Sequence, residues 1–549
     1  MGSDSDIASW YAGQSIFVTG ATGFMGKVLV EKLLRCCPDV STIYIVIRHK
    51  KGRNSSQRLE DFWNSPVFDK LRDRQNSETI LNKLKCLSGD VVHPNLSLDE
   101  DVIQELEHNV TVVFHMAANV RFDQPLKSAV LLNTGGTLNV LDLACRFKKV
   151  KVFVHTSTSY CHCDETRLEE KLYPAPHNPR HILDLAKWMD GDLLKLLTPK
   201  LLGNSPNTYA YTKCLTEQLV SEYQSKLPIA ICRPSIVIAA WKEPLPGWVD
   251  NLNGPTGILI GAGKGVIRTM HCNADFIADV VPVDVSVNSL MLIAWKTGSQ
   301  PKENQADVFN VTVNKKFAKS WGEALAMGRK HFYDYPFSVC LWYPGGNIKS
   351  TYLAHAIAVF FLHLIPAYLV DFLMYLTNNK PFLVQTQKRI QNGLSVLQYY
   401  TTRPWNFSNE KLQRVSEGLS DRDRAVFYLD EGQIINDDYM KTYILGARKY
   451  CVHEEPETIP YARKVLKRLY YLDVLTNMLL ICLLAWGFYL LVVNFASGLN
   501  LPGTFPNKPL KDLNLKAEAS FANTSGDAGH RKINNLTRSS DIAALGKFL

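Results

Sequence analysis

The chain has 549 residues, more than a single hydrophobic core accommodates, so several structural units are expected. Its net charge of +9, with 21% charged residues, is a mild basic excess without a basic stripe of interleaved aromatic residues. These features argue against nucleic acid as a partner and are compatible with an anionic cofactor or a membrane surface.

Near the N-terminus, the sequence VTGATGFMGK follows an apolar, β-branched run and precedes Val and Leu residues at helical spacing. This order predicts a strand, a glycine turn and a helix. In the pattern G-x-x-G-x-x-G, the glycines allow a tight turn, close approach of a phosphate, and close packing of helix on sheet. We therefore expect a dinucleotide whose pyrophosphate lies at the helix N-terminus. The expected loop residues are Gly20, Thr22, Gly23, Phe24 and Gly26.

The second predicted strand, in IYIVIRHKKGR, is followed by a cluster of cations that contains Arg48 and Arg53. An NAD site has an acidic residue here for the ribose 2′-hydroxyl, whereas cations suit a 2′-phosphate. The expected cofactor is therefore NADPH. Further along, Asp90 follows another candidate strand and is expected to bond the adenine, while Ala117 and Ala118 flank the cofactor more deeply.

Hydroxyl side chains end the predicted strand in FVHTSTSY, where Thr158 is the favoured group to hold a carbonyl oxygen and Ser157 the second choice. Downstream, in NTYAYTK, Tyr209 and Lys213 lie four residues apart, on one helix face. We expect the ammonium to lower the pKa of the phenol, so that Tyr209 relays protons near neutral pH. The sequence CHCDE, which directly follows FVHTSTSY, has no second Cys or His pair at zinc-site spacing, so no metal is expected.

Two apolar stretches follow. The segment Tyr352 to Leu376 is interrupted by two histidines, a proline and Asp371, so we expect a re-entrant or interfacial segment or a channel wall, with plain core packing as the alternative. The stretch from Val474 to Phe495 carries no charge and is long enough for a transmembrane helix. The basic residues before it are Arg463, Lys464, Lys467 and Arg468. This bias places the body of the protein in the cytosol. For a cytosolic body with a single C-terminal anchor we expect the endoplasmic reticulum, with the peroxisome second.

The alternation of apolar runs and helical patterns from Ser15 to about Trp295 is typical of an α/β fold with a Rossmann-type, doubly wound parallel sheet. We expect the sheet and a substrate lobe to be followed by a smaller, mostly helical C-terminal domain and the transmembrane helix. The predicted units are a NADP(H)-binding domain with its substrate lobe (1–300), a connecting region (301–350), the apolar segment (351–380), the helical domain (381–470), the transmembrane helix (474–495) and a disordered tail (498–549).

Together these motifs resemble the extended short-chain dehydrogenase/reductases and, more narrowly, the fatty acyl-CoA reductases that make fatty alcohols. The segments that carry the resemblance are VTGATGFMGKVLVEKLLR, VRFDQPL, EEKLYPAP, NTYAYTK, CRPSIV, GPTGILIGAGKGVIRTM, RPWNFSNEKLQRV and YILGARKY. The resemblance implies that two NADPH reduce a long-chain acyl-CoA, through an enzyme-bound aldehyde, to a primary alcohol with release of CoA. It also implies that Tyr209 donates the proton, Thr158 supports the oxyanion and Lys213 holds the nicotinamide ribose.

Two alternatives stay open on the residues. One is another membrane-bound extended reductase, such as a hydroxysteroid dehydrogenase, which consumes one NADPH per product instead of two. The other is a catalytically silent membrane scaffold that only binds the nucleotide, against which the intact Tyr209, Lys213 and Thr158 argue.

Overall fold

The computed structural model describes residues 5–48, 55–301, 305–429 and 434–498. Contacts between residues divide the chain into two compact units, Met1–Arg463 and Lys464–Leu549. The boundaries predicted near residues 300, 350 and 380 fall inside the first unit and stay predictions.

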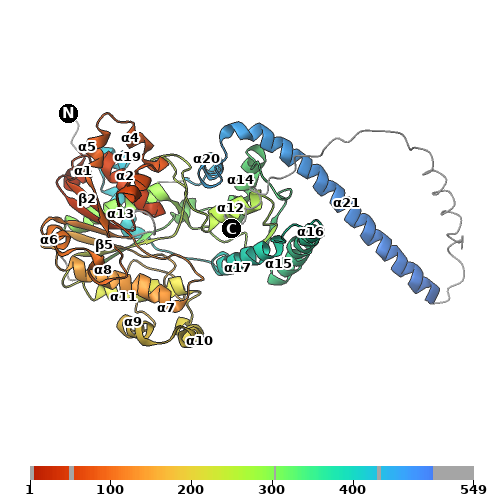
Figure 1. The fold of residues 1–549 in the computed structure, drawn as a ribbon, viewed down its shortest axis with the longest axis horizontal. Coiled ribbons are helices and arrows are strands. Elements are labelled where there is room, and N and C mark those ends of the chain that lie inside the picture. Colours follow the sequence, from red (N-terminus) through yellow and green to blue (C-terminus); the bar gives the residue numbers. More distant parts are fainter. Residues whose placement is uncertain (1–4, 49–54, 302–304, 430–433, 499–549) are drawn as a thin grey trace. The chain divides into compact units, whose positions relative to one another are not determined.

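A seven-stranded parallel sheet, in the order β10–β6–β5–β4–β1–β2–β3, forms the centre of the first unit (Figure 1). Its strands are β1 (Ser15–Thr19), β2 (Thr42–Ile47), β3 (Leu84–Ser88), β4 (Val112–His115), β5 (Val152–Thr156), β6 (Ile229–Pro234) and β10 (Asp307–Val311). Every residue of β1, β4, β5 and β6 is buried, as their apolar and β-branched sequences predict for a sheet covered on both faces. The Rossmann-type α/β fold is therefore confirmed.

Helices cover both faces of this sheet (Figure 1). On one face, α2 (Phe24–Cys36) packs against α13 (Val283–Gly298), which also contacts β5 and β6. On the other face, α8 (Gly136–Ala144) packs against α11 (Thr208–Ser221). The strand order reverses between β1 and β4, and in open α/β sheets ligands bind at the carboxyl ends of the strands at such a point.

Two short parallel sheets and further helices complete the first unit. Two parallel pairs form, β7 (Ile236–Ile238) with β9 (Val280–Pro282), and β8 (Thr269–His271) with β11 (Asn347–Lys349). The remaining helices of the first unit up to Asp334 are α1 (Asp6–Tyr11), α3 (Ser55–Trp63), α4 (Asp69–Arg72), α5 (Ser77–Leu81), α6 (Glu100–Asn109), α7 (Leu126–Ala129), α9 (Pro179–Trp188), α10 (Gly191–Leu202), α12 (Pro255–Gly263) and α14 (Trp321–Asp334). Beyond them lie α17 (Leu383–Thr401), α18 (Glu410–Glu417), α19 (Asp421–Val426) and α20 (Asp437–Gly446).

Among the described residues, two helices are long and apolar enough to cross a membrane by length and composition. One comprises α15 (Tyr352–Val359), a π-type turn and α16 (Ile365–Leu376). The other is Pro456–Phe495, which lies mostly in α21 (Ile459–Gly498) and contains the predicted transmembrane stretch. The tail predicted to be disordered lies outside the described residues from residue 499 onward.

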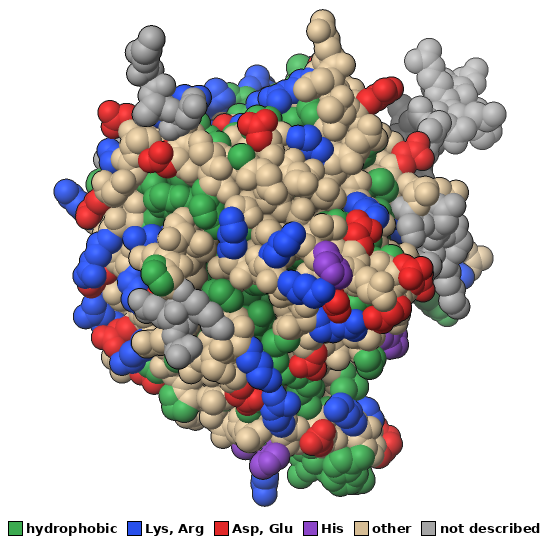
Figure 2. Space-filling view, turned by 90° about the vertical axis from the view of Figure 1, so that its left-hand side faces the viewer, with side chains coloured by type: hydrophobic (Ala, Val, Ile, Leu, Met, Phe, Trp, Pro, Cys, Tyr) green, Lys and Arg blue, Asp and Glu red, His purple; other side chains and the backbone are tan. Residues whose placement is uncertain are grey.

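On the face of the molecule shown in Figure 2, basic and acidic side chains are interspersed, with small apolar areas between them. That face carries no single broad basic stripe of the kind that binds nucleic acid.

Candidate active site

The glycine loop connects β1 to α2 at the carboxyl edge of the sheet. Gly20 has a φ of +77°, and a Cβ there would lie 2.7 Å from the backbone nitrogen of Ala117, just after β4. A Cβ on Gly26 would lie 2.2 Å from the carbonyl oxygen of Gly20. A side chain is therefore sterically excluded at both positions. The absence of a side chain at Gly20 allows the turn and the contact with the end of β4, and its absence at Gly26 allows α2 to pack close to the loop.

The start of α2 fits the pyrophosphate of a dinucleotide. Gly23 is the N-cap residue in an extended conformation, and no side chain caps the helix. The first backbone N–H groups of a helix lack intrahelical partners and, with the helix dipole, attract anions. Thr22 is exposed in this loop. The ring of Phe24 stacks on the buried Trp248, with 5.3 Å between ring centroids, so it fixes the helix start against the substrate lobe.

The residues expected near the adenosine lie at the ends of β2 and β3, which are hydrogen-bonded neighbours. Arg48 follows β2 and is exposed, and its carbonyl oxygen accepts a hydrogen bond from Arg58. Arg53 lies outside the described residues. The carboxylate of Asp90 accepts a hydrogen bond from the backbone of Val92 at 3.2 Å, so it also shapes its own turn.

The end of β4 is held by a buried network. The backbone N–H of Ala117 donates to Thr19 Oγ1 at 3.3 Å, and Ala117 and Ala118 are half-buried. His115 lies between Thr19 and Thr137, with its ring nitrogens 2.7 and 2.8 Å from their hydroxyl oxygens. Burial lowers the pKa of His115 to about 3, so the ring is neutral at physiological pH.

Tyr209 and Lys213 lie on α11, as their spacing predicts. Asn207 caps this helix by accepting a hydrogen bond from the N–H of Ala210 at 2.9 Å. Lys213 Nζ lies 6.0 Å from the centroid of the Tyr209 ring and donates to the carbonyl oxygen of Thr156, the last residue of β5, at 2.6 Å. The pair therefore stands at the carboxyl end of β5.

The electrostatics of this pair differ from the expectation. Burial raises the pKa of Tyr209, so the phenol is protonated and suited to donating a proton. Burial also lowers the pKa of Lys213 to about 8, an effect that Glu217 partly opposes. The predicted lowering of the tyrosine pKa by the ammonium is thus wrong in direction for the protein alone, because burial and the nearby Cys161 both raise the pKa of Tyr209.

Both candidate hydroxyls follow β5 and are buried. Thr158 Oγ1 accepts a hydrogen bond from the backbone N–H of Tyr160 at 3.2 Å, which leaves its own proton to donate. Among the described residues, Ser157 Oγ has no hydrogen-bond partner. An unpartnered buried hydroxyl is costly, so its position suits contact with a ligand. Either group can therefore hold a carbonyl oxygen, and the structure leaves Thr158 and Ser157 both as candidates.

Two asparagines that sequence reasoning missed connect this site to its surroundings. Asn133 accepts a hydrogen bond from the N–H of Asn119 at 2.8 Å and donates to Thr212 Oγ1 at 3.0 Å, so it links the loop after β4 to α11. Asn207 donates to the hydroxyl of Tyr400 at 2.7 Å. The position of Asn133 as a lone polar residue in the apolar run VLLNTGG could have indicated a structural role. Nothing in the local sequence indicates the contact between Asn207 and Tyr400.

One cluster of side chains in the structure has residue types that can bind a metal, although we expect no metal site. Ligand atoms of Cys161, His162 and Glu217 lie within 4.8 Å of one another and are buried. However, Arg233 donates to both carboxylate oxygens of Glu217, at 2.8 and 2.5 Å. A fully buried guanidinium at this distance neutralises the carboxylate and opposes a divalent cation, so we keep the prediction that no metal binds.

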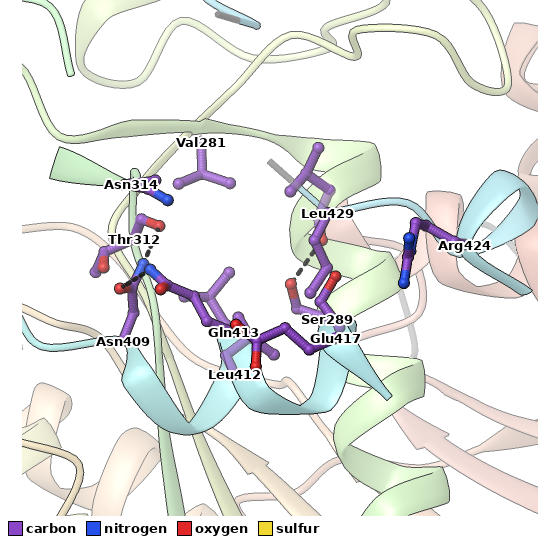
Figure 3. Close-up of a pocket in the computed structure, with 13 residues that line it drawn as sticks. Val281, Ser289, Thr312, Asn314, Asn409, Leu412, Gln413, Glu417, Arg424 and Leu429 are labelled. Carbon is purple, nitrogen blue, oxygen red and sulfur yellow. Dashed lines mark hydrogen bonds between the residues drawn. The ribbon is translucent and has the colours of Figure 1, made fainter. Parts of the chain in front are cut away.

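A separate cavity of about 300 Å³ lies between α13, the chain after β10, and α18 (Figure 3). Asn409 donates to the carbonyl oxygen of Thr312 at 3.0 Å and accepts from Gln413 at 2.7 Å on its wall. None of the predicted site residues lines this cavity, so it is distinct from the dinucleotide site.

Comparison with known families gives two matches along the chain. A family model described as male sterility protein, with a NAD-binding domain, matches residues 18–290. A second model with the same description matches residues 362–454. The first match contains the glycine loop and all the predicted catalytic residues, and the second begins within the apolar segment.

Curated relatives align over most of the chain. Fatty acyl-CoA reductase 1 of Xenopus laevis is 39% identical over 478 residues, which cover 87% of this chain and 92% of the relative. The human protein of the same name is 37% identical, with 88% of this chain and 93% of the relative covered. Fatty acyl-CoA reductase 2 of Bos taurus is 37% identical over the same shares.

Solved structures support the fold alone. The terminal R domain of the myxalamid biosynthetic pathway aligns with a TM-score of 0.51 at 17% identity, covering 81% of this chain and 92% of that one. A reductase domain of a non-ribosomal peptide synthetase from Mycobacterium tuberculosis aligns with a TM-score of 0.52 at 15% identity, covering 80% and 95%.

Proposed function

Because the chain belongs to the fatty acyl-CoA reductase family, we propose that it reduces a long-chain acyl-CoA to a primary fatty alcohol with NADPH. The observation that carries this proposal is the location of Tyr209, Lys213 and the Ser157–Thr158 hydroxyls at the carboxyl end of β5. The glycine loop follows β1 at the same edge of the sheet.

NADPH fits this edge because the glycine loop excludes side chains and the start of α2 offers free N–H groups. We propose that Gly20, Gly23 and Gly26 surround the pyrophosphate and that Arg48, with Arg53, favours a 2′-phosphate. Bound NADPH supplies one hydride in each of two successive reductions.

In the first reduction, we propose that the protonated Tyr209 and the Thr158 hydroxyl, with Ser157 as the alternative, donate hydrogen bonds to the thioester oxygen and stabilise its developing charge. The C–S bond of the resulting hemithioacetal then breaks, releasing CoA and an aldehyde that stays bound. In the second reduction, Tyr209 donates a proton to the aldehyde oxygen, giving the alcohol. The ammonium of Lys213 donates a hydrogen bond to the carbonyl oxygen of Thr156 at the end of β5, and in both steps it would hold the nicotinamide ribose when the cofactor is bound.

We further propose that the α21 stretch Val474–Phe495 anchors the protein with its catalytic body in the cytosol, since Arg463, Lys464 and two further cations precede it. The endoplasmic reticulum is the proposed compartment, ahead of the peroxisome.

The test is to incubate membranes that carry the full chain with NADPH and acyl-CoAs of graded length and to identify the products by mass spectrometry. We expect fatty alcohol at two NADPH consumed per molecule. The Tyr209→Phe variant is expected to lose at least about 100-fold in rate with NADPH binding retained, because it lacks the donated proton. Tyr211→Phe, on the same helix, is the matched control.

The outcomes separate the alternatives. One NADPH per product on a steroid substrate supports a hydroxysteroid-type reductase, and nucleotide binding without any product supports a silent scaffold. Full activity of Tyr209→Phe would remove the proposed role of this phenol.

A further inference from the structure

The helix Tyr352–Leu376 presents its polar residues to the protein interior. His355, His363 and Asp371 are buried, although most of the large apolar side chains of the same helix are exposed. His363 accepts a hydrogen bond from the backbone N–H of Arg268 at 2.8 Å and contacts the Gln391 amide at 2.7 Å. His355 lies 3.1 Å from the hydroxyl of Thr269 in β8. The groups that interrupt the apolar pattern are therefore satisfied by protein, not by solvent.

Asp371 fixes the other end of this helix. Its carboxylate accepts hydrogen bonds from the N–H groups of Phe382, Leu383 and Val384, at 3.1, 2.9 and 2.9 Å, and so caps the start of α17. A carboxylate in this position supplies partners for N–H groups that a helix start otherwise leaves free. If the helix left the protein to cross a bilayer, these hydrogen bonds would break, and Asp371 would be exposed to hydrocarbon without its partners.

The outward face of the same helix is apolar along its length. Its exposed large side chains are Tyr352, Leu353, Ile357, Phe360, Phe361, Ile365, Tyr368, Leu369, Val370, Phe372, Leu373, Tyr375 and Leu376. No charged side chain stands among them, so the polar rim typical of protein interfaces is missing along the helix. Tyrosines at both ends resemble the aromatic residues that mark the boundary between lipid and water.

The charge around this face identifies its partner. From Ser350 to Asn409 the only acidic residue is the buried Asp371. The same stretch carries Lys380, Lys388, Arg389 and Arg403, all exposed. In this stretch of sequence, exposed cations and no exposed carboxylate accompany the apolar face, a combination that complements an anionic lipid surface.

We infer that the outward face of Tyr352–Leu376 docks in the plane of an anionic lipid bilayer and inserts its apolar side chains among the lipids without spanning it. This docking surface goes beyond the proposed reaction and does not depend on it. It gives the first unit its own membrane contact, separate from the apolar stretch of α21.

The experiment uses the full-length protein in vesicles that contain a phospholipid with a photoreactive group. In one set the group lies near the headgroup, and in the other it lies at the end of the acyl chain. After illumination, trypsin cuts after Lys349 and Lys388, and mass spectrometry locates the lipid adducts. We expect shallow labelling of the outward residues, whereas Val474–Phe495 takes both labels and shows that the protein is inserted.

Matched variants test the face itself. Leu369→Glu with Phe372→Glu is expected to lower shallow labelling about tenfold, since two apolar side chains that insert among the lipids are replaced by charged ones. Leu193→Glu with Leu196→Glu changes exposed leucines on α10 and is expected to leave this labelling unchanged. Lys388→Glu with Arg389→Glu moves the tryptic boundary from Lys388 to Lys411, since Arg403 precedes Pro404. This variant is expected to lower shallow labelling in anionic vesicles and not in neutral ones. Unchanged melting temperatures verify that the variants fold.

Three results would overturn the inference. Labelling of Val474–Phe495 without labelling of residues 350–388 would show no lipid contact. Equal shallow and deep labelling on all sides of the helix, including His355 and His363, would show a spanning helix. Absence of lipid adducts on this face, together with cross-links between two copies formed by an amine-reactive reagent through Lys380 or Lys388, would show a protein interface.

Discussion

At the scale of single residues, burial sets the protonation of the catalytic pair. The pKa of Lys213 falls to about 8 because the ammonium loses its hydration, while the pKa of Tyr209 rises for the same reason. In the free protein near neutral pH, the lysine is therefore charged and the tyrosine is a proton donor. This is the state that a reductase needs, since it must place a proton on an oxygen.

A pH dependence follows from the lysine. Below a pH of about 8 Lys213 carries its proton, and above it the charge is lost, so we expect kcat/KM to fall as the pH rises through about 8. The measurement is kcat/KM from pH 6 to about 10. The Lys213→Met variant is expected to have a low kcat/KM throughout and to lack the inflection near pH 8.

The exposed Lys226 offers the control, since it also lies beside a tyrosine ring, 5.4 Å from the centroid of Tyr223. Lys226→Met is expected to keep the inflection of the parent protein. An inflection near pH 8 that persists in Lys213→Met would assign it to another group.

At the scale of elements, the loop between β1 and α2 depends on the absence of side chains. Gly20 and Gly13 both have a positive φ, but only at Gly20 does an added Cβ meet backbone, that of Ala117 and Met116. Gly13→Ala therefore carries conformational strain of about 1–2 kcal/mol. Gly20→Ala adds a clash of about 1–3 kcal/mol to the same strain.

We expect Gly20→Ala to unfold at a clearly lower denaturant concentration than Gly13→Ala and to lose NADPH affinity, because the loop must shift to relieve the clash. Chemical denaturation and cofactor titration measure the two effects. Equal destabilisation by the two substitutions would mean that the contact with β4 relaxes freely.

Elements with local signals could be predicted from the sequence. The strand–glycine–helix order, the alternating apolar runs and the Tyr209–Lys213 spacing each depend on neighbours in the chain. The sheet and the shared helix of Tyr209 and Lys213 could therefore be predicted, whereas the catalytic role of the pair stays a prediction. The interior location of His355, His363 and Asp371 is not, because it depends on partners in β8 and α17. The direction of the Tyr209 pKa likewise needs the burial that only the fold supplies.

At the scale of the whole molecule, the C-terminal part of the first unit reaches the catalytic helix. Tyr400, near the end of α17, accepts a hydrogen bond from Asn207, the residue that caps α11 ahead of Tyr209. The ring of Phe122 contacts both Tyr400 and Tyr209, with 5.6 Å and 5.8 Å between ring centroids. The region matched by the second family model therefore packs against the start of the helix that carries Tyr209, the proposed proton donor.

This coupling yields a prediction across the molecule. Tyr400→Phe leaves the buried amide of Asn207 without its partner, a loss of about 1–3 kcal/mol in the free energy of unfolding. We expect kcat to fall as well, with NADPH affinity unchanged, because the start of α11 loosens while the glycine loop is intact. Tyr399→Phe is the control, since that hydroxyl bonds the exposed Arg403.

A double-mutant cycle makes the connection specific. Asn207→Ser retains a capping hydroxyl for α11 but removes the amide that reaches Tyr400. If the hydrogen bond carries the effect, Asn207→Ser and Tyr400→Phe together cost less than the sum of the single changes, in both kcat and stability. Strict additivity would mean that the two residues act separately. The helical region would then support the sheet by packing alone and leave the position of Tyr209 to α11.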